Sequence, residues 1–237
     1  MPYLMAGFPD LGTSRAVGEA CIDSGANLLE LGVPFSDPLA DGPVIHAAAT
    51  EALKAGSTLH GVLRVCESLA DQVPVVLMVY ANVVLAGGDG AFAERAAAAG
   101  AAGLIVPDLP HDEAESLREA CDANGLALVP LAAPNTPAER LAAIAADARG
   151  FVYTVSVAGT TGERSELPQE LRATVQRVRS AASVPVAVGF GISTPEQARQ
   201  VAEIADGVIV GSRVVRAAGE GGPDAVAEVI AELASAL

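Results

Sequence analysis

The sequence predicts an α/β fold, a single (β/α)8 barrel that spans residues 1–237. Three observations predict this class. Eight short apolar runs recur along the whole chain, the stretches between them carry apolar residues at helical spacing, and small residues with Gly or Asn precede most runs. Continuous apolar runs are typical of parallel strands that are covered on both faces. Eight strand–helix units in about 250 residues are what such a barrel requires.

The eight runs are the predicted strands, at residues 3–6, 28–31, 75–78, 104–106, 126–129, 151–153, 186–188 and 208–210. Five of them follow phrases such as Ala123-Asn124-Gly125, in which a glycine suits the left-handed residue that ends a helix. The stretches between runs carry helical stripes, for example Ala198, Val201, Ala202 and Ala205. An open doubly wound sheet is the alternative, but its GxGxxG turn is absent after the first run. We expect one domain, because the sequence contains no linker.

The charge of the chain excludes several classes of partner. With 14 basic and 29 acidic residues, the formal charge is −15, which disfavours non-specific binding to nucleic acid and to anionic membranes. Hydrophobic residues make up 51% of the chain, enough for a large core. No apolar run approaches the ~20 residues of a spanning helix, and the N-terminus lacks a signal segment. We therefore expect a soluble, cytoplasmic protein.

The cysteines and histidines do not indicate a metal site. Cys21, Cys66 and Cys121 are widely spaced without a CxxC motif, and Cys66 and Cys121 continue helical apolar stripes, so we expect buried thiols. His46, His60 and His111 are scattered over segments that favour helices; a metal site built from them is a less favoured alternative.

The lysine content excludes Schiff-base chemistry. The single lysine, Lys54, lies in a predicted helix and not at a strand end. A Schiff-base aldolase, or a barrel that holds its own pyridoxal phosphate, is therefore not expected.

Three carboxylates follow the second run, where a barrel would place its active site. Glu30 lies inside the run, so burial is expected to raise its pKa toward the range useful for proton transfer. Asp37 and Asp41 lie on a proline-rich loop that suits neither helix nor strand. They form a candidate acid/base set. The alternative is that Glu30 is salt-bridged and both aspartates form turns.

Glycine-rich turns follow the last two runs, at residues 189–193 and 211–212. Their backbone N–H groups could hold a phosphate, and loops seven and eight are the usual phosphate site of this fold; tight turns without a ligand are the alternative. Residues 156–164 form a polar, glycine-hinged loop that suits a lid. The alternative is a loop that only connects two elements and has no function of its own. The chemistry left open is proton transfer on a phosphorylated small molecule, with carboxylates and Tyr153.

Six segments together resemble the tryptophan synthase alpha chain family. The first and most specific, residues 29–43, reads LELGVPFSDPLADGP. The resemblance continues through residues 77–82, 107–110, 159–164, 189–193 and 211–212, and so covers the chain in order. It implies a (β/α)8 barrel that cleaves indole-3-glycerol phosphate to indole and glyceraldehyde 3-phosphate. It also implies an α2β2 complex with a beta chain that carries the pyridoxal phosphate, while this chain carries no cofactor.

The resemblance assigns roles by motif position. Glu30 and Asp41 match the catalytic carboxylates of the family. The positions on the substrate side are Tyr3, Met78, Tyr80, Ile105, Tyr153, Thr161, Phe190 and Ile209, and the phosphate-binding positions are Gly162, Gly191, Gly211 and Ser212. In the chemistry this implies, Glu30 exchanges protons with the substrate. Asp41 accepts a hydrogen bond from the indole N–H as positive charge develops.

Three features depart from the family pattern. The helix that usually precedes the first strand is expected to be absent or truncated here, and His46 and Thr160 stand where glutamine and valine are commoner. Two other functions stay open at this point. One is a stand-alone indole-3-glycerol phosphate lyase, and the other is a weakly catalytic subunit that mainly activates a beta chain.

Overall fold

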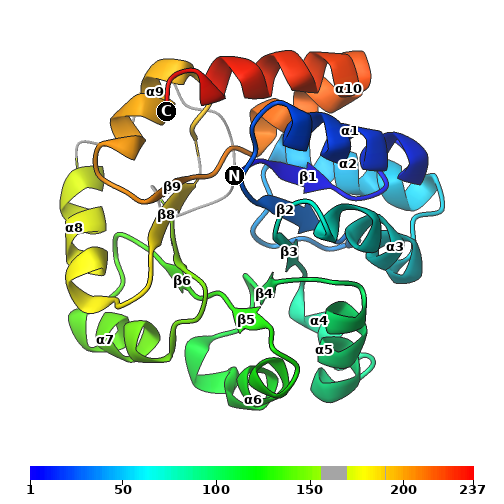
Figure 1. Ribbon diagram of the computed structural model, residues 1–237. Coiled ribbons are helices and arrows are strands. Elements are labelled where there is room, and N and C mark those ends of the chain that lie inside the picture. The colour runs from blue at the N-terminus through cyan, green and yellow to red at the C-terminus, as the bar shows by residue number, and fades with distance from the viewer. Residues whose placement is uncertain (156–169, 190) are drawn as a thin grey trace.

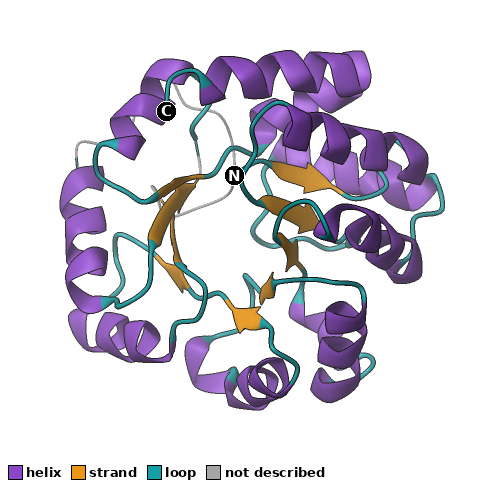
Figure 2. Ribbon diagram, in the orientation of Figure 1, coloured by secondary structure: helices purple, strands orange, loops and turns teal. Residues whose placement is uncertain are grey.

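The computed structural model describes residues 1–155, 170–189 and 191–237. Parallel strands form an inner ring, and helices surround it (Figure 1; Figure 2). The strands are β1 (Tyr3–Met5), β2 (Leu29–Gly32), β3 (Val75–Met78), β4 (Gly103–Ile105), β5 (Ala127–Leu128), β6 (Leu131–Ala132), β7 (Val152–Val155), β8 (Val186–Gly189) and β9 (Gly207–Val208). This arrangement confirms the predicted (β/α)8 class.

The ring consists of two parallel sheets, β1 to β5 and β6 to β9, each in chain order. A parallel bridge between Pro2 and Val210 joins the last strand to the first, and Tyr3 N donates to Val210 O at 2.9 Å. At the other junction, Val129 N donates to Leu104 O at 2.8 Å and Tyr153 N donates to Pro130 O at 2.9 Å. These hydrogen bonds carry the pairing around the whole ring.

One predicted strand differs from the structure. The fifth run, residues 126–129, is shorter than the barrel strand, which continues through Pro130 into β6. Pro130 has no N–H to donate, so the strand is divided into β5 and β6 at that residue. The nine strands of the described residues therefore make eight barrel positions.

The helices cover the outside of the ring. They are α1 (Leu11–Asp23), α2 (Pro43–Lys54), α3 (Leu59–Ala70), α4 (Ala81–Leu85), α5 (Asp89–Ala98), the 3-10 helix η1 (His111–Glu113), α6 (Glu115–Ala123), α7 (Ala138–Asp147), α8 (Leu171–Ala181), α9 (Pro195–Ala202) and α10 (Ser212–Ala234). Within the described residues, no helix is both long and apolar enough to cross a bilayer.

Glycines end several helices as the sequence predicted. Gly25, Gly100 and Gly125 directly follow the C-caps of α1, α5 and α6 and have φ between 71° and 105°, where a side chain would be strained. Gly150 also has a positive φ, 68°, but it lies two residues beyond Ala148, the extended C-cap of α7. Gly207 is the exception among the five phrases, because it is the first residue of β9. A Cβ there would lie 2.9 Å from Met1 Sδ, so this glycine provides space rather than a left-handed turn.

The strands separate two apolar layers. Alternate residues such as Leu29, Leu31 and Leu77 pack outward against the helices, in a cluster that includes the buried Cys66 and Cys121. The other residues of the strands point into the barrel. There they form two smaller clusters, one around Tyr3 and Met5 and the other around Ile105 and Tyr153. The polar side chains described in the next subsection lie among these inward-facing residues.

Candidate active site

Glu30 is a fully buried carboxyl on the inward face of β2. It lies beside Tyr3 of β1 and Val76 of β3 in the parallel register, and its exposed fraction is 0%. Neither carboxyl oxygen has a hydrogen-bond partner within the described residues, and Glu30 forms no ion pair there closer than 4.0 Å, which overturns the salt-bridge interpretation. Burial raises the pKa of Glu30 to about 8, against the opposing effect of the N-terminal ammonium group. Glu30 can therefore hold a proton near neutral pH.

Asp41 lies on the loop that follows β2, as predicted, and is partly buried. The Tyr80 hydroxyl hydrogen-bonds its carboxylate and accepts a hydrogen bond from Ala40 N at 3.0 Å. Burial raises the pKa of Asp41, and the Tyr80 hydrogen bond opposes that rise. Asp37 is different: it is exposed, and its carboxylate accepts a hydrogen bond from Ser36 Oγ at 2.5 Å.

Tyr80 is itself held from two sides. Its ring stacks on Phe35 with a centroid distance of 5.3 Å. The next residue, Ala81, begins α4 and donates its N–H to Asp108 Oδ1 at 2.8 Å. The sequence analysis assigned no role to Asp108, although a carboxylate between β4 and the short helix η1 is the available signal. Phe35, Asp108 and Tyr80 together fix the loop that carries Asp41.

Two tyrosine side chains each pack against a glycine of the neighbouring strand. A Cβ on Gly32 would overlap the Tyr3 hydroxyl, and a Cβ on Gly189 would overlap the Tyr153 hydroxyl. Burial raises the pKa of both tyrosines, and the Glu30 carboxylate adds to the shift in each. Tyr3 is also shifted by Asp41, so Glu30, Asp41 and both rings lie in one electrostatic environment.

The predicted apolar positions gather around these groups. Met78, Ile105, Tyr153 and Ile209 belong to one inward cluster, and Met78 also packs against the cluster that contains Tyr3. Phe190, Thr161, Gly162 and the proposed lid lie outside the described residues. The described part of the predicted indole pocket is thus an apolar wall with Glu30 set into it.

The predicted phosphate positions follow the neighbouring strands β8 and β9. Gly191 has φ 88°, Gly211 is the N-cap of α10, and Ser212 is its first residue. The next side chain, Arg213, donates a hydrogen bond to the carbonyl of Ser193 and so ties the two turns together. The first N–H groups of a helix have no partner within the helix, so this end of α10 suits an anion.

The contact between Tyr153 and Gly189 can be tested by adding a side chain at the glycine. We expect Gly189→Ala to destabilise the protein by about 1–3 kcal/mol, because the methyl group must displace the buried Tyr153 ring. Gly211→Ala is the matched control, since a Cβ there meets Tyr3 Cβ at an ordinary 3.6 Å. Urea unfolding of both variants measures the difference. Equal free energies of unfolding would show that Gly189 makes no room for Tyr153.

The chemistry available is acid/base catalysis in an apolar chamber. A neutral carboxyl at Glu30 and a carboxylate at Asp41 form a pair whose environments differ, which suits separate roles. Among the described residues, no group of three or more histidine, cysteine or acidic side chains is placed to hold a metal ion.

Comparison with known proteins identifies the family. The model of the family described as tryptophan synthase alpha chain matches residues 1–236. The tryptophan synthase alpha chain of Prochlorococcus marinus (strain MIT 9313) is 51% identical over 96% of this chain and 84% of its own length. That of Synechococcus elongatus (strain ATCC 33912 / PCC 7942 / FACHB-805) is 49% identical over 100% and 90%.

Solved structures agree with these sequence relatives. A chain of Mycobacterium tuberculosis tryptophan synthase superposes with a TM-score of 0.93 at 41% identity, covering 99% of this chain and 90% of that one. A chain of the tryptophan synthase α2β2 complex from Pyrococcus furiosus gives 0.91 at 39% identity, with 99% and 96% covered. This chain therefore belongs to the tryptophan synthase alpha chain family.

Proposed function

We propose that this chain is the alpha subunit of a tryptophan synthase and that it cleaves indole-3-glycerol phosphate to indole and glyceraldehyde 3-phosphate. The observation that carries the proposal is Glu30, a fully buried carboxyl without a hydrogen-bond partner among the described residues, at the motif position of the family's catalytic glutamate. A buried polar group left unpaired is costly in a native protein. A substrate that hydrogen-bonds Glu30 supplies the missing partner.

In the proposed reaction, Glu30 moves protons at two substrate atoms. It protonates the indole ring carbon that bears the side chain, and then, as a carboxylate, takes the proton from the hydroxyl on the first side-chain carbon. The bond between the ring carbon and this hydroxyl-bearing carbon breaks. Its electron pair returns to the ring, and the hydroxyl-bearing carbon becomes the aldehyde. A carboxyl whose pKa is raised to about 8 suits both the donor and the acceptor task.

Asp41 has an electrostatic role in this proposal. Protonation of the ring places positive charge on the indole nitrogen, and a carboxylate that accepts a hydrogen bond from that N–H stabilises the charge. The ring itself would pack on Tyr3, Met78, Ile105 and Ile209. The phosphate would be held by the backbone N–H groups at Gly191, Gly211 and Ser212, together with Gly162.

The partner in this proposal is a tryptophan synthase beta chain, in an α2β2 complex that receives the indole. Pyridoxal phosphate belongs to that partner, and this chain carries no cofactor of its own. The family supports a cytoplasmic location. We also propose that residues 1–237 form one domain.

The test is an indole-release assay with indole-3-glycerol phosphate, run with and without an added beta chain. We expect slow release by the isolated chain and a clear increase in the complex. High turnover by the isolated chain, unchanged by the beta chain, would favour a stand-alone lyase. Negligible release even in the complex would favour an activating subunit and contradict the proposal.

The same assay run across pH tests the proton donor. If Glu30 must begin the reaction protonated, kcat/KM should fall tenfold per pH unit above pH of about 8, where Glu30 of the free chain loses its proton. The measurement is kcat/KM for indole release between pH 6 and pH 10, because this ratio reports the pKa of the free chain. A kcat/KM that already falls as the pH rises from 6 to 7 would contradict a neutral Glu30 as the donor.

Tyr80→Phe tests how Asp41 is held. A hydrogen bond to a charged group contributes about 1.5–3 kcal/mol, so we expect turnover to fall about tenfold. The Tyr80 hydrogen bond lowers the pKa of Asp41, so its loss should move the acidic limb of the pH profile upward. Phe35→Leu is the control, because it removes the stacking partner but leaves the hydroxyl. An unmoved acidic limb in Tyr80→Phe would contradict this role.

A further inference from the structure

A pocket lies between α6 and α7, and none of the residues assigned roles above lines it. Its volume is about 280 Å³. α6 packs against α5 and α7 packs against α8, which leaves the pocket between the two pairs. Pro130, where the barrel strand divides, lines the pocket with Leu128, Leu131 and Ile144, and Leu131 also packs against the inward cluster around Ile105 and Tyr153. Glu30, Asp41 and Tyr80 are not among its lining residues.

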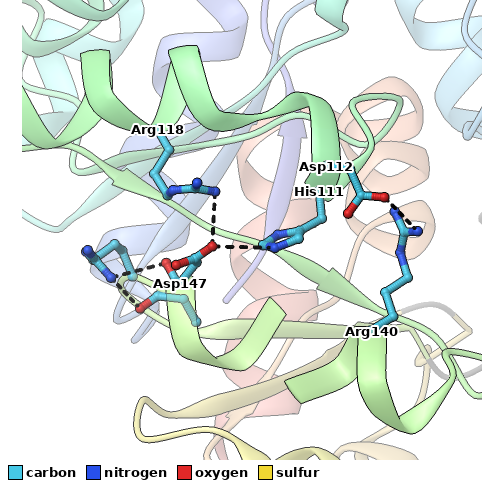
Figure 3. Close-up of polar contacts among 7 residues, drawn as sticks. His111, Asp112, Arg118, Arg140 and Asp147 are labelled. Carbon is cyan, nitrogen blue, oxygen red and sulfur yellow. Dashed lines mark hydrogen bonds and ion pairs between the residues drawn. The ribbon is translucent and has the colours of Figure 1, made fainter. Parts of the chain in front are cut away.

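Two arginines and a histidine line this pocket, in a chain with a formal charge of −15. They are Arg118, Arg140 and His111. Arg118 Nη1 lies 3.3 Å from Asp147 Oδ2, and His111 Nε2 lies 3.4 Å from the same oxygen. Figure 3 shows both side chains reaching Asp147 from α6 and η1, with Arg140 on the far side of His111.

These ion pairs are loose. Charge-assisted hydrogen bonds prefer about 2.7–2.9 Å, and both contacts to Asp147 are longer. Arg118 has five N–H donors, yet within the described residues the contact to Asp147 is its one polar side-chain contact. Its side chain is 21% exposed, so it is mostly withdrawn from water without being fully paired. Arg140 lies 3.3 Å from Asp112, whose side chain is 71% exposed. Such an exposed ion pair contributes little stability, so a ligand carboxylate can replace Asp112 as the partner of Arg140.

We propose that this pocket binds a small aromatic or aliphatic monocarboxylate. The ligand carboxylate would lie on the Arg118 fork, which matches a carboxylate in shape, with Arg140 as the second cation. Its apolar body would cover Leu128, Leu131 and Ile144. The volume of about 280 Å³ is just below the range of about 300–1,000 Å³ for drug-sized ligands. A body of one or two rings fits such a space.

The charges in the pocket favour a monocarboxylate over a phosphate. Asp147 remains beside the cations, so the pocket carries too little net positive charge for a dianion. The side chains of Leu128, Leu131 and Ile144 would leave the other oxygens of a phosphate without partners. A ligand with one carboxylate on an apolar body can pair with the arginines and also cover the apolar side chains of the pocket.

The experiment is a titration of the full chain with 2-naphthoate, compared with its neutral amide, 2-naphthamide. Saturating indole is present throughout to fill the proposed indole site. Binding is followed by isothermal titration calorimetry, because the added indole fluoresces as a tryptophan side chain would. We expect the acid to bind about tenfold more tightly than the amide, which is the expected gain from a hydrogen bond between charged groups. Equal affinities would overturn the proposal.

Three variants locate the binding. Arg118→Gln should weaken 2-naphthoate binding about tenfold and leave the amide unchanged. Arg172→Gln, on α8 with a side chain that is 67% exposed, makes the same charge change elsewhere and should have no effect. Asp147→Asn should tighten 2-naphthoate binding, because it frees Arg118 and His111 from a competing carboxylate. A purely structural ion pair predicts the reverse, so weaker binding in Asp147→Asn would overturn the proposal.

The outcome is independent of the proposed lyase function. Indole release tests Glu30, whereas naphthoate binding tests Arg118, and either can fail alone. If Arg118→Gln does not fold, Arg140→Gln and Asp147→Asn still decide the question. Weaker binding in Arg140→Gln, together with tighter binding in Asp147→Asn, would support the pocket.

Discussion

Replacing Glu30 by glutamine is expected to abolish indole release and, at the same time, to stabilise the protein at neutral pH. The amide keeps the shape of the side chain but cannot exchange a proton. General acid–base catalysis contributes about 10²–10⁴-fold to rates, so the loss should be of that size and should fall on turnover. Glu30→Gln therefore separates the chemical role of Glu30 from its place in the core.

The gain in stability follows from the pKa of Glu30. The pKa is about 8 in the folded chain, against 4.5 for an ordinary glutamate. The folded state therefore binds a proton that the unfolded state releases, and stability falls as the pH rises from 4.5 through 8. At pH 7 this costs about 3 kcal/mol, which glutamine does not incur.

Urea unfolding of the wild type and Glu30→Gln between pH 5 and pH 8 checks this. The difference in unfolding free energy should widen steadily with pH. Glu228→Gln, an exposed substitution on α10, is the matched control and should show no such trend. A constant difference across the pH range would mean that Glu30 is ionised in the folded chain, and retained indole release would remove it from the chemistry.

Asp41→Asn is expected to lower turnover about a hundredfold or more, with little effect on stability. The amide cannot supply the negative charge that favours the developing indole cation, and losing one such preorganised group costs about 10²–10³-fold. Indole release under saturating substrate measures the effect. The folding effect should be small, because Asp41 is only partly buried and lies on a loop.

Asp37→Asn provides the matched control on the same loop. Asp37 is exposed, and its carboxylate accepts a hydrogen bond from the neighbouring Ser36 hydroxyl. We expect it to keep most of the activity. If Asp37→Asn were impaired as strongly as Asp41→Asn, the loop as a whole would matter, and Asp41 would lose its separate role.

The sequence alone determined the strand pattern and the burial of Glu30. A carboxylate inside a continuous apolar run, in a strand covered on both faces, is withdrawn from bulk solvent. The same logic held for the thiols of Cys66 and Cys121, which lie on helical stripes. Local rules also placed the helix-ending glycines, since a left-handed residue is a property of the local backbone.

Tertiary structure alone decided which residues meet across the ring. The pairing of Tyr3 with Gly32, and of Tyr153 with Gly189, depends on the register between neighbouring strands. The hydrogen bond from Tyr80 to Asp41 joins residues 39 positions apart in the sequence, and the contact of Arg118 with Asp147 joins residues 29 positions apart. A one-dimensional pattern fixes the face on which a side chain lies. Its neighbours on that face follow from barrel closure, because closure sets the register and spacing of strands that are distant in the sequence.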